Sequence, residues 1–289
     1  MRRGPLLAAL TGISCLYALA ALRKRFAPGG DGRRAWPLNV AHRGASARFP
    51  ENTLAAFRAA VEAGAGGLEM DAHLTRDGHP VVLHDPTVDR TTGGSGVVAG
   101  MTLAEVRRLD AGGSGRRDER VPTLTEVLTA FPGVPLNIDV KDSVPGAEKA
   151  VLDALRAAGT ERRALVASFQ HRVLRRIRRA AGGEYDTGAS RPEIGVFWAL
   201  SRLRLEALIS PAYTALQVPT KYRGLRVVTP RFVRAAHSRG VRVDVWTINE
   251  PGEMRELLDM GVDSVMTDRP EVLAEVLEGR KAGRRRAFP

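Results

Sequence analysis

Two segments of this 289-residue chain alternate apolar and polar side chains, and several of the polar ones are charged. The segments are residues 67–74, GLEMDAHL, and residues 135–141, PLNIDVK. Side chains of a β-strand alternate between two faces, so the polar residues of each segment share one face. These polar residues are Glu69, Asp71, Asn137, Asp139 and Lys141. Packing of the apolar residues under helices would turn the polar set toward the interior of the protein.

Carboxylates in a buried interior are stable only when a cation or hydrogen-bond donors pair with them. Glu69, Asp71 and Asp139 would converge there, and three carboxylates make the oxygen-rich site that Mg²⁺ or Ca²⁺ prefers. The spacing equally allows internal salt bridges in which Lys141 or Arg43 pairs with these acids. The residues therefore predict either one divalent cation, Mg²⁺ or Ca²⁺, or an ion-paired interior.

Two histidines stand at the ends of predicted strands. His42 ends the segment 38–42, and His84 ends the segment 79–84. Histidine titrates near neutral pH, so such a pair can serve as base and acid in hydrolysis. Hydrogen bonding of either ring to the rim of the sheet is the alternative. The remaining histidines are interpreted as surface or helix residues: His73, His79, His171 and His237.

Short apolar segments alternate with amphipathic helical segments from residue 38 onward. The predicted strands are 38–42, 67–74, 79–84, 135–141, 163–169, 194–198, 214–218, 241–248 and 263–267. The predicted helices are 53–63, 123–130, 147–158, 171–181, 230–239, 252–260 and 271–278. This α/β alternation indicates a parallel sheet covered by helices, and its number of units favours a closed (β/α)₈ TIM barrel over an open sheet. The stretch 91–120, rich in Gly and Arg, is expected to form a loop-rich excursion.

A series of short motifs resembles the glycerophosphodiester phosphodiesterase family. The motifs are His42-Arg43-Gly44, Pro50-Glu51-Asn52-Thr53, Glu69-Met70-Asp71, His84-Asp85, Leu136-Asn137-Ile138-Asp139-Val140-Lys141, Ser168-Phe169, Val245-Trp246-Thr247-Ile248-Asn249 and Met266-Thr267-Asp268-Arg269-Pro270. The resemblance covers about residues 38–275, and the order and spacing of the motifs make it specific. It implies a (β/α)₈ barrel, a divalent cation, and hydrolysis of glycerophosphodiesters to glycerol 3-phosphate and an alcohol.

The resemblance also implies roles by position. These roles are catalysis by His42 and His84, metal binding by Glu69, Asp71 and Asp139, phosphate contacts by Arg43 and Lys141, and pocket positions for Glu51, Phe169 and Trp246. At Asp139 the family usually has the longer glutamate, so this ligand would reach the ion through water or draw it inward. A charge beside a helix N-terminus explains Glu51 equally well. Packing in the core is the alternative for Phe169 and Trp246.

An apolar segment precedes the predicted barrel. Residues 5–22 carry no charge, and their length is close to the roughly 20 residues that span a bilayer as a helix. The predicted division is a hydrophobic N-terminal anchor helix with basic flanks, a linker, the barrel domain and a basic tail, at residues 1–25, 26–37, 38–279 and 280–289. More basic residues follow the span than precede it, which places the body in the cytoplasm. A cleaved signal peptide, and hence a secreted protein, is the alternative.

The net charge of +12 lies mostly at the two ends, residues 1–34 and 280–289, and the body is almost neutral. This pattern favours contact of the ends with an anionic membrane surface and argues against nucleic acid as a partner. In a barrel both ends leave opposite the catalytic mouth, so we expect small soluble glycerophosphodiesters as substrates. The alternatives are a lysophospholipase D or related phospholipase with a long apolar groove, and a non-catalytic phosphodiester-binding barrel. The single cysteine, Cys15, excludes an intrachain disulfide.

Overall fold

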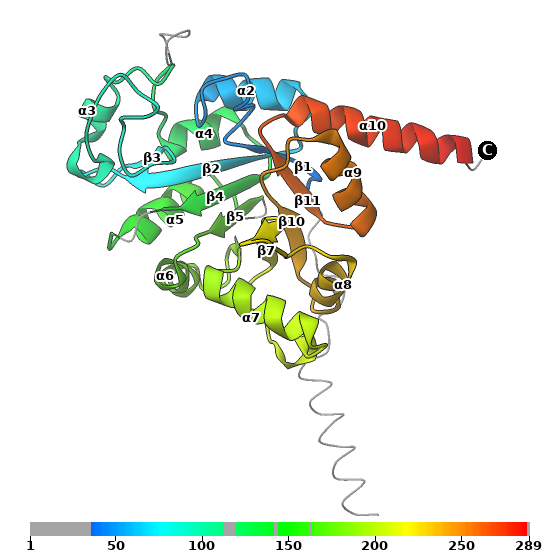
Figure 1. Cartoon of the computed structure of the whole chain (residues 1–289). Coiled ribbons are helices and arrows are strands. Elements are labelled where there is room, and N and C mark those ends of the chain that lie inside the picture. Colours follow the sequence, from blue (N-terminus) through cyan, green and yellow to red (C-terminus); the bar gives the residue numbers. More distant parts are fainter. Residues whose placement is uncertain (1–35, 113–118, 142–143, 162, 288–289) are drawn as a thin grey trace, which may run out of the picture.

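A ring of parallel strands surrounded by helices forms the body of the protein (Figure 1). The computed structural model describes residues 36–112, 119–141, 144–161 and 163–287. The strands of the ring are β1 (Asn39–His42), β2 (Gly67–Leu74), β4 (Leu136–Val140), β5 (Ala164–Ala167), β6 (Asp186–Thr187), β7 (Ala215–Val218), β10 (Arg242–Val245) and β11 (Ser264–Thr267).

Strand pairing closes the sheet on itself. The strands follow the order β6-β5-β4-β2-β1-β11-β10-β7, and every pair along this path is parallel. A parallel bridge between Gly188, which follows β6, and Ala215 of β7 joins the two ends. The predicted α/β class and (β/α)₈ barrel are therefore confirmed.

An outer layer of helices covers the barrel. Its members are α2 (Leu54–Glu62), α4 (Leu124–Ala130), α5 (Ala147–Ala157), α6 (His171–Ala181), α7 (Arg191–Arg202), α8 (Pro230–Ser238), α9 (Pro251–Met260) and α10 (Pro270–Ala287). The outward side chains of the strands, such as Leu68, Met70 and Ile138, pack against these helices in the main core clusters. The polar residues that alternate with them on β2 and β4 must therefore face the barrel interior, as the period-two pattern predicts.

Several helices begin at side-chain caps that the sequence supplies. The hydroxyl of Thr53 accepts a hydrogen bond from the backbone N–H of Ala56 at 3.2 Å and starts α2. Thr123 starts α4 with a capping box completed by Glu126. Such caps satisfy backbone donors that a helix leaves without partners. They also fix where the loop at each strand end gives way to helix.

Two predicted strands differ from the structure, and one strand of the ring was not predicted. Residues 194–198 lie inside α7, because the Ser190 capping box starts a helix just upstream and a five-residue apolar run does not distinguish strand from helix. The strand at this place in the ring is β6, whose two residues carry no apolar pattern. The segment 79–84 contributes β3 (Pro80–Val82), which pairs antiparallel with β2 and is not a barrel strand.

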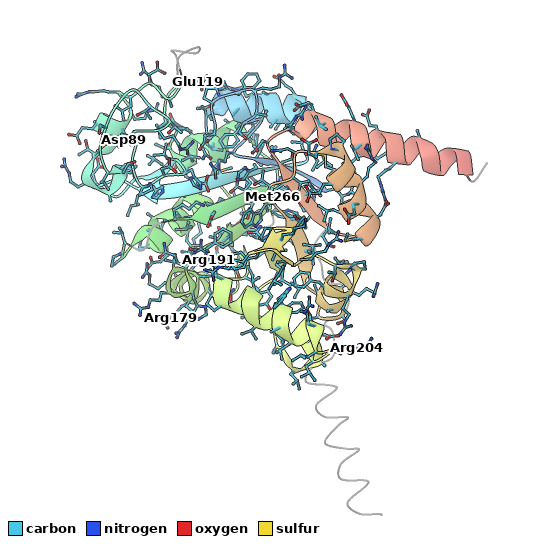
Figure 2. All side chains as sticks on the ribbon, viewed as in Figure 1. Asp89, Glu119, Arg179, Arg191, Arg204 and Met266 are labelled. Carbon is cyan, nitrogen blue, oxygen red and sulfur yellow. The ribbon has the colours of Figure 1, made fainter. Side chains whose placement is uncertain are left out.

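The excursion that follows β3 is more ordered than the sequence suggests. It contains the short helices η1 (Val98–Gly100) and α3 (Leu103–Val106). Apolar residues that include Val88, Val98 and Val106 form a small core of its own. Figure 2 shows Asp89 on this excursion, well away from Arg179 on α6 and from Arg204 beyond the end of α7. The excursion is thus a packed unit set on the mouth of the barrel beside β2.

The predicted N-terminal anchor and C-terminal tail can be compared with the described residues at each end of the chain. Residues 5–22, the proposed anchor, lie outside the described residues, as does most of the predicted linker. Among the residues that the structure does describe, no helix is long and apolar enough to cross a membrane. At the other end, α10 continues to Ala287, well beyond the predicted helix 271–278. It runs away from the edge at which the arrows of β2 and β4 end (Figure 1).

Candidate active site

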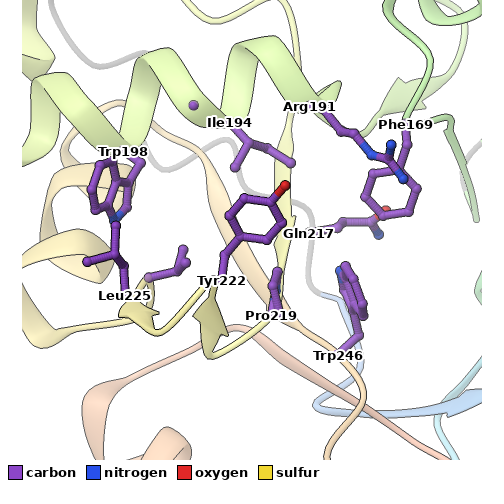
Figure 3. Close-up of a pocket in the computed structure, with 11 residues that line it drawn as sticks. Phe169, Arg191, Ile194, Trp198, Gln217, Pro219, Tyr222, Leu225 and Trp246 are labelled. Carbon is purple, nitrogen blue, oxygen red and sulfur yellow. The ribbon is translucent and has the colours of Figure 1, made fainter.

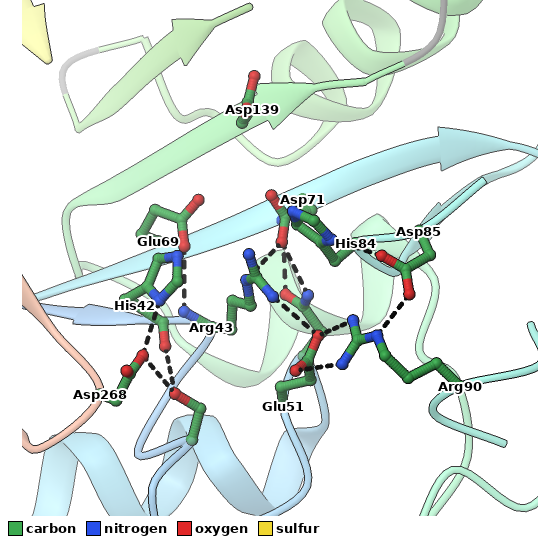
Figure 4. A network of polar contacts seen from close by, with 12 residues as sticks. His42, Arg43, Glu51, Glu69, Asp71, His84, Asp85, Arg90, Asp139 and Asp268 are labelled. Carbon is green, nitrogen blue, oxygen red and sulfur yellow. Dashed lines mark hydrogen bonds and ion pairs between the residues drawn. The ribbon is translucent and has the colours of Figure 1, made fainter. Parts of the chain in front are cut away.

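The C-terminal ends of β1, β2 and β4 bring the predicted site residues together (Figure 4). His42 lies opposite Glu69 in the register of β1 and β2, and Asp71 lies opposite Asp139 in the register of β2 and β4. His84 follows β3, whose pairing with β2 carries it back to the same edge. Parallel strands end at one face of a barrel, which is where such enzymes place their catalytic groups. Five side chains distant in sequence therefore share one mouth.

His42 is held through one ring nitrogen. Its Nδ1 lies 2.7 Å from a carboxylate oxygen of Asp268, which also accepts hydrogen bonds from Ser46 and Asn249. Although burial raises it, hydrogen bonds from His42 and Asn249 lower the pKa of Asp268 to about 2, so this carboxylate is ionised and only accepts. Nδ1 of His42 therefore carries a proton, and Nε2 is left to exchange one with a substrate.

The pKa of His42 is shifted by its neighbours. Burial alone lowers the pKa of this imidazole, but the Glu69 carboxylate and the hydrogen bond to Asp268 outweigh burial and raise it above 6.5. A histidine with a raised pKa keeps its proton further into the neutral range. His42 is thus suited to act in its protonated or its neutral form near physiological pH.

His84 has the same kind of support. Its Nδ1 lies 2.7 Å from an oxygen of Asp85. A hydrogen bond from Arg90 is the largest reason that the pKa of Asp85 falls to about 2. The backbone carbonyl of His84 accepts a hydrogen bond from Nε2 of His73 at 3.1 Å. Each of the two predicted catalytic histidines is therefore oriented through Nδ1 by an ionised aspartate, with Nε2 available for proton transfer.

The predicted metal ligands are buried, and two of them are paired with cations. Asp71 contacts Nζ of Lys141 at 2.9 Å and Nε of Arg43 at 3.1 Å. Asp139 contacts the same Lys141 ammonium at 2.6 Å through one oxygen. Its other oxygen is buried without a hydrogen-bond partner. The internal salt bridges with Lys141 and Arg43, left open as an alternative by the sequence, are thus present in the structure.

The negative charge of the three buried carboxylates Glu69, Asp71 and Asp139 is not fully neutralised by Lys141 and Arg43. Burial and the nearby Asp71 raise the pKa of Glu69 to about 7. Burial likewise raises the pKa of Asp139, whereas Lys141 and Arg43 overcome burial and lower the pKa of Asp71. Glu69 and Asp139 would therefore be stabilised in their charged form by an added cation.

A hard divalent cation fits these residues in the chemistry of its donors. Three buried carboxylates, one of them with an unpaired oxygen, are the oxygen ligands that Mg²⁺ and Ca²⁺ take. Within the described ranges, however, no group of three or more His, Cys, Asp or Glu side chains is arranged to hold a metal ion. The Lys141 ammonium instead lies between Asp71 and Asp139. Binding of a cation between Asp71 and Asp139 would require this lysine to turn away.

A chain of ion pairs crosses the mouth between the two histidines (Figure 4). Nη1 of Arg43 donates to Glu51 at 3.0 Å, and both terminal nitrogens of Arg90 donate to Glu51 at 2.8 and 2.9 Å. Nε of Arg90 reaches Asp85, the partner of His84. Glu51 thus links Arg43 to Arg90, and Arg90 in turn holds Asp85, the partner of His84. These contacts go beyond a charge placed beside a helix N-terminus.

Sequence reasoning missed part of this network. Arg90 carried no signal, because it lies in an irregular segment. His73 was interpreted as a surface or helix residue, but it is only 5% exposed and donates to His84. The inward alternation of Glu69 and Asp71 could have placed it, since His73 continues the same face of β2. Asp268 and Asn249 were noted only as members of motifs.

Phe169 and Trp246, the two aromatic residues predicted to line the pocket, lie together beside Lys141. The rings of Phe169 and Trp246 meet edge to face with centroids 5.6 Å apart. Nζ of Lys141 is 6.0 Å from the Phe169 ring centre. Gln217, on the same side of the interior, donates to Asn137 at 3.1 Å. The aromatic rings of Phe169 and Trp246 are therefore separated from the carboxylate cluster only by the side chain of Lys141.

A closed parallel barrel that carries two histidines, each held by an aspartate, and a buried carboxylate cluster at its mouth has the groups that an acid–base hydrolase requires. The model of the glycerophosphoryl diester phosphodiesterase family matches residues 42–272, and the chain belongs to that family. The resemblance inferred from the sequence motifs is confirmed. The protein is therefore an enzyme, a phosphoric diester hydrolase.

Similar proteins agree over most of the chain. It is 38% identical over 260 residues to a glycerophosphodiester phosphodiesterase of Caldanaerobacter subterraneus subsp. tengcongensis, covering 85% of this chain and 99% of the relative. A glycerophosphodiester phosphodiesterase structure from Agrobacterium tumefaciens superimposes with a TM-score of 0.67 at 27% identity, over 81% of this chain and 98% of that one. An Oleispira antarctica phosphodiesterase in complex with the product sn-glycerol-3-phosphate gives 0.68 at 27% identity, over 83% and 96%.

Proposed function

We propose that this protein hydrolyses small glycerophosphodiesters to glycerol 3-phosphate and an alcohol with the aid of one divalent cation. The observation that carries the proposal is the pair of histidines, each fixed through Nδ1 by an ionised aspartate on either side of a buried carboxylate cluster. The sn-glycerol-3-phosphate bound to the Oleispira antarctica enzyme supports this product class.

Arg43 and Lys141 would stabilise the negative charge that develops on the phosphate during the reaction. A phosphodiester is an anion, and charge builds on its phosphoryl oxygens as a nucleophile approaches. Arg43 and Lys141 project into the mouth, where both could turn from Asp71 to a phosphate oxygen. A divalent cation held by Glu69, Asp71 and Asp139 would add Lewis-acid stabilisation of the same charge.

Proton transfer falls to the two histidines. One Nε2 removes a proton from the attacking hydroxyl, which belongs either to water or to the substrate glycerol. Attack by the glycerol hydroxyl forms a cyclic phosphate, which water then opens to glycerol 3-phosphate. The other Nε2 delivers a proton to the leaving oxygen of the alcohol. Asp268 and Asp85 hold the two rings in the tautomer that this exchange requires.

The test is release of glycerol 3-phosphate from glycerophosphocholine and glycerophosphoethanolamine by the full-length protein. The assay is run with added Mg²⁺ or Ca²⁺ and again after chelation. The proposal expects release with the cation and loss of most activity after chelation. Full activity after thorough chelation would contradict the metal role. Absence of release under all conditions would favour the non-catalytic phosphodiester-binding barrel.

A further inference from the structure

The outer face of α7 is apolar, whereas a helix on a protein surface usually turns charged and polar residues outward. Between the arginines at its two ends, the exposed positions are Pro192, Gly195, Val196 and Ala199. Leu203, at the C-cap, continues this face, and Val196 and Leu203 are 56% and 67% exposed. A contiguous apolar face of this kind marks a surface that another body covers.

The inner side of the same helix is also apolar. Phe197 is fully buried in the core. Ile194 and Trp198 face a pocket that is also lined by a hairpin of β8 (Lys221–Tyr222) and β9 (Leu225–Arg226) (Figure 3). A helix that is largely apolar around its circumference is stable between two apolar surroundings. The protein core is one of them, and the other comes from outside the described part of the chain.

Two more exposed leucines extend the apolar surface beyond the end of α7. Leu205 is 43% exposed, and Leu208, in the short helix η3 (Glu206–Leu208), is 61% exposed. Four of the ten large apolar residues that are exposed in the described part of the chain thus lie between Val196 and Leu208. Their concentration favours a docking surface over apolar residues scattered singly. The exposed apolar residues from Pro192 to Leu208 are called the α7 face below.

Arginines flank the α7 face. The neighbouring helix α6 contains five arginines and no acidic residue, and Arg172, Arg175 and Arg179 share its outer side by their helical spacing. Arg202 and Arg204 are exposed at the end of α7. Within the ranges that the structure describes, none of these five side chains forms an ion pair. Figure 2 shows Arg179 on α6 and Arg204 beyond α7 along the same side of the molecule.

We infer that the α7 face and the outer arginines of α6 lie on an anionic membrane surface. The apolar side chains would enter the boundary between headgroups and acyl chains, and the arginines would contact lipid phosphates, as in helices that lie in a membrane interface. Each basic residue close to such a surface is attracted by its negative potential. The inference is independent of the proposed function, because no residue of the mouth takes part.

A second copy of the chain does not fit this surface. A twofold interface uses the same patch on both copies, so it would bring two sets of arginines together. The acids on this side are already paired, Glu193 with Arg178 at 2.5 Å and Glu206 with Arg231 at 2.7 Å. They are therefore not free to pair with the arginines of a second copy, whereas lipid phosphates would supply the missing negative charge.

The chain that precedes the described residues agrees with a membrane as the partner. Residues 5–22 are the predicted membrane span. The described chain begins at Trp36, which packs against Ala215 at the start of β7, the strand that follows the segment of Leu208. Residues 23–35 join the two and reach roughly 40 Å when extended. A span tethered this closely would raise the local concentration of the bilayer, so weak contacts of the α7 face suffice.

Docking through α7 would lay the barrel on its side. This helix belongs to the wall of the barrel and lies across from α2 (Figure 1). The mouth would then open along the membrane rather than into it. Small soluble diesters, the proposed substrates, would still reach the mouth in this orientation.

The single cysteine of the chain allows each side of the barrel to be probed separately. In the full-length protein with Cys15→Ser, the change Ala199→Cys places a fluorescent label on the α7 face, and Arg58→Cys places one on α2. Both positions are exposed. Vesicles with a lipid-bound quencher consist of phosphatidylcholine alone or with phosphatidylglycerol. We expect the anionic vesicles to quench the label at position 199, the neutral vesicles to quench it less, and neither to quench the label at position 58.

Arg175→Glu and Leu203→Asp test the charged and the apolar part of the surface separately, with the label at position 199. Each should lower the ratio of docked to undocked protein on anionic vesicles by at least about fivefold, since one basic residue near such a surface contributes about that factor. The matched controls are Arg58→Glu on α2 and Val97→Asp on the excursion, where Val97 is 55% exposed. Neither control should change the quenching. All four variants should keep wild-type turnover of glycerophosphocholine, which shows that they are folded.

Equal quenching of the two labels would overturn the inference, as would quenching that Arg175→Glu and Leu203→Asp leave unchanged. A response of the label at position 199 without vesicles that grows with protein concentration would show that the α7 face joins copies of the chain instead. A full-length protein that does not sediment with anionic vesicles would overturn the inference too. None of these outcomes affects release of glycerol 3-phosphate, by which the proposed function is tested.

Discussion

His42 and His84 each meet an aspartate through Nδ1 at 2.7 Å, so their orientation depends on Asp268 and Asp85. The two supports differ in origin. Asp268 follows β11 and is shared with Asn249, whereas Asp85 is adjacent to His84 and is held by Arg90. The consequence is that each histidine can be altered through its partner without touching the ring itself.

The variant Asp268→Asn should shift the pH dependence of the reaction. The hydrogen bond from Asp268 helps to raise the pKa of His42, so its removal lowers that pKa. Whichever limb of the kcat/KM profile reports His42 then moves to lower pH. Loss of an orienting carboxylate behind a histidine should also reduce activity by about 10–100-fold. The profile is measured on glycerophosphocholine.

A matched control for this variant is a half-buried histidine–aspartate pair outside the mouth. His237 lies 2.7 Å from Asp263, a pair of the same type outside the mouth. Asp263→Asn should leave both limbs of the profile in place. A profile of Asp268→Asn that coincides with that of the wild type would show that Asp268 does not control the titration of His42.

Asp139→Glu tests the metal role of a single residue. The family usually has a glutamate here, and one oxygen of Asp139 is buried without a partner. The longer side chain should therefore retain or tighten Mg²⁺ binding, whereas Asp139→Ala should weaken it. Titration calorimetry with the metal alone gives both affinities. Loss of binding in Asp139→Glu would indicate a site rebuilt around the shorter side chain.

At the scale of elements, the mouth is assembled by strands whose periodicity was visible in the sequence. Glu69, Asp71 and Asp139 could be placed inside the barrel because polar and apolar side chains alternate strictly in β2 and β4. The helix α7 could not be recognised, since its apolar run resembles a buried strand until the Ser190–Glu193 capping box is considered. The strand β6 could not be predicted from the sequence, because it has only two residues and no apolar pattern. Its position is determined by pairing with the neighbouring strand β5.

The excursion after β3 contains a site residue, Arg90, that could not be predicted from the sequence either. Arg90 bridges Asp85, which lies in the same loop, and Glu51, which lies far away in the chain, through ion pairs. No periodicity governs such a contact, so composition identified only a loop-rich stretch. The part of the site on regular strands was therefore predictable, and the part on irregular backbone was not.

Arg90→Ala should lower kcat by about 10–100-fold, because supports of this kind hold the reacting groups in place. The protein should stay folded, since Arg90 is on the surface of the excursion with a side chain 48% exposed. Circular dichroism and turnover of glycerophosphocholine are the measurements. Arg156→Ala is the matched control, as Arg156 pairs with Glu184 at 2.7 Å away from the mouth. Equal activity of the two variants would show that Arg90 has no positioning role.

At the scale of the whole molecule, the residues that would perform the reaction lie between His42 and Asp268, all within the segment matched by the family model. The proposed chemistry therefore does not depend on the predicted anchor. Trp36, at the start of the described chain, stacks on Arg242 inside the barrel with the cation 4.6 Å from its ring. The packed barrel therefore includes Trp36, two residues before the predicted start of the barrel domain at residue 38.

Deletion of residues 1–34 should give a soluble protein with unchanged kcat on glycerophosphocholine. The reason is that the truncation removes the predicted membrane span and keeps Trp36 and the mouth. Fractionation of cells and a turnover assay are the measurements, with the full-length protein as control. A truncated protein that stays in the membrane fraction would contradict the anchor. A mature protein found outside the cell and beginning near Ala21 would overturn the cytoplasmic location.

The central claim is that His42 and His84 carry proton transfer in phosphodiester hydrolysis. It is tested most directly by release of glycerol 3-phosphate from glycerophosphocholine by the wild type, His42→Ala and His84→Ala, each shown to be folded. General acid and base groups contribute about 10²–10⁴-fold, so each variant should lose activity by that factor. A variant that keeps more than about a tenth of wild-type turnover would contradict the role of its histidine, since a group that transfers a proton contributes far more than that.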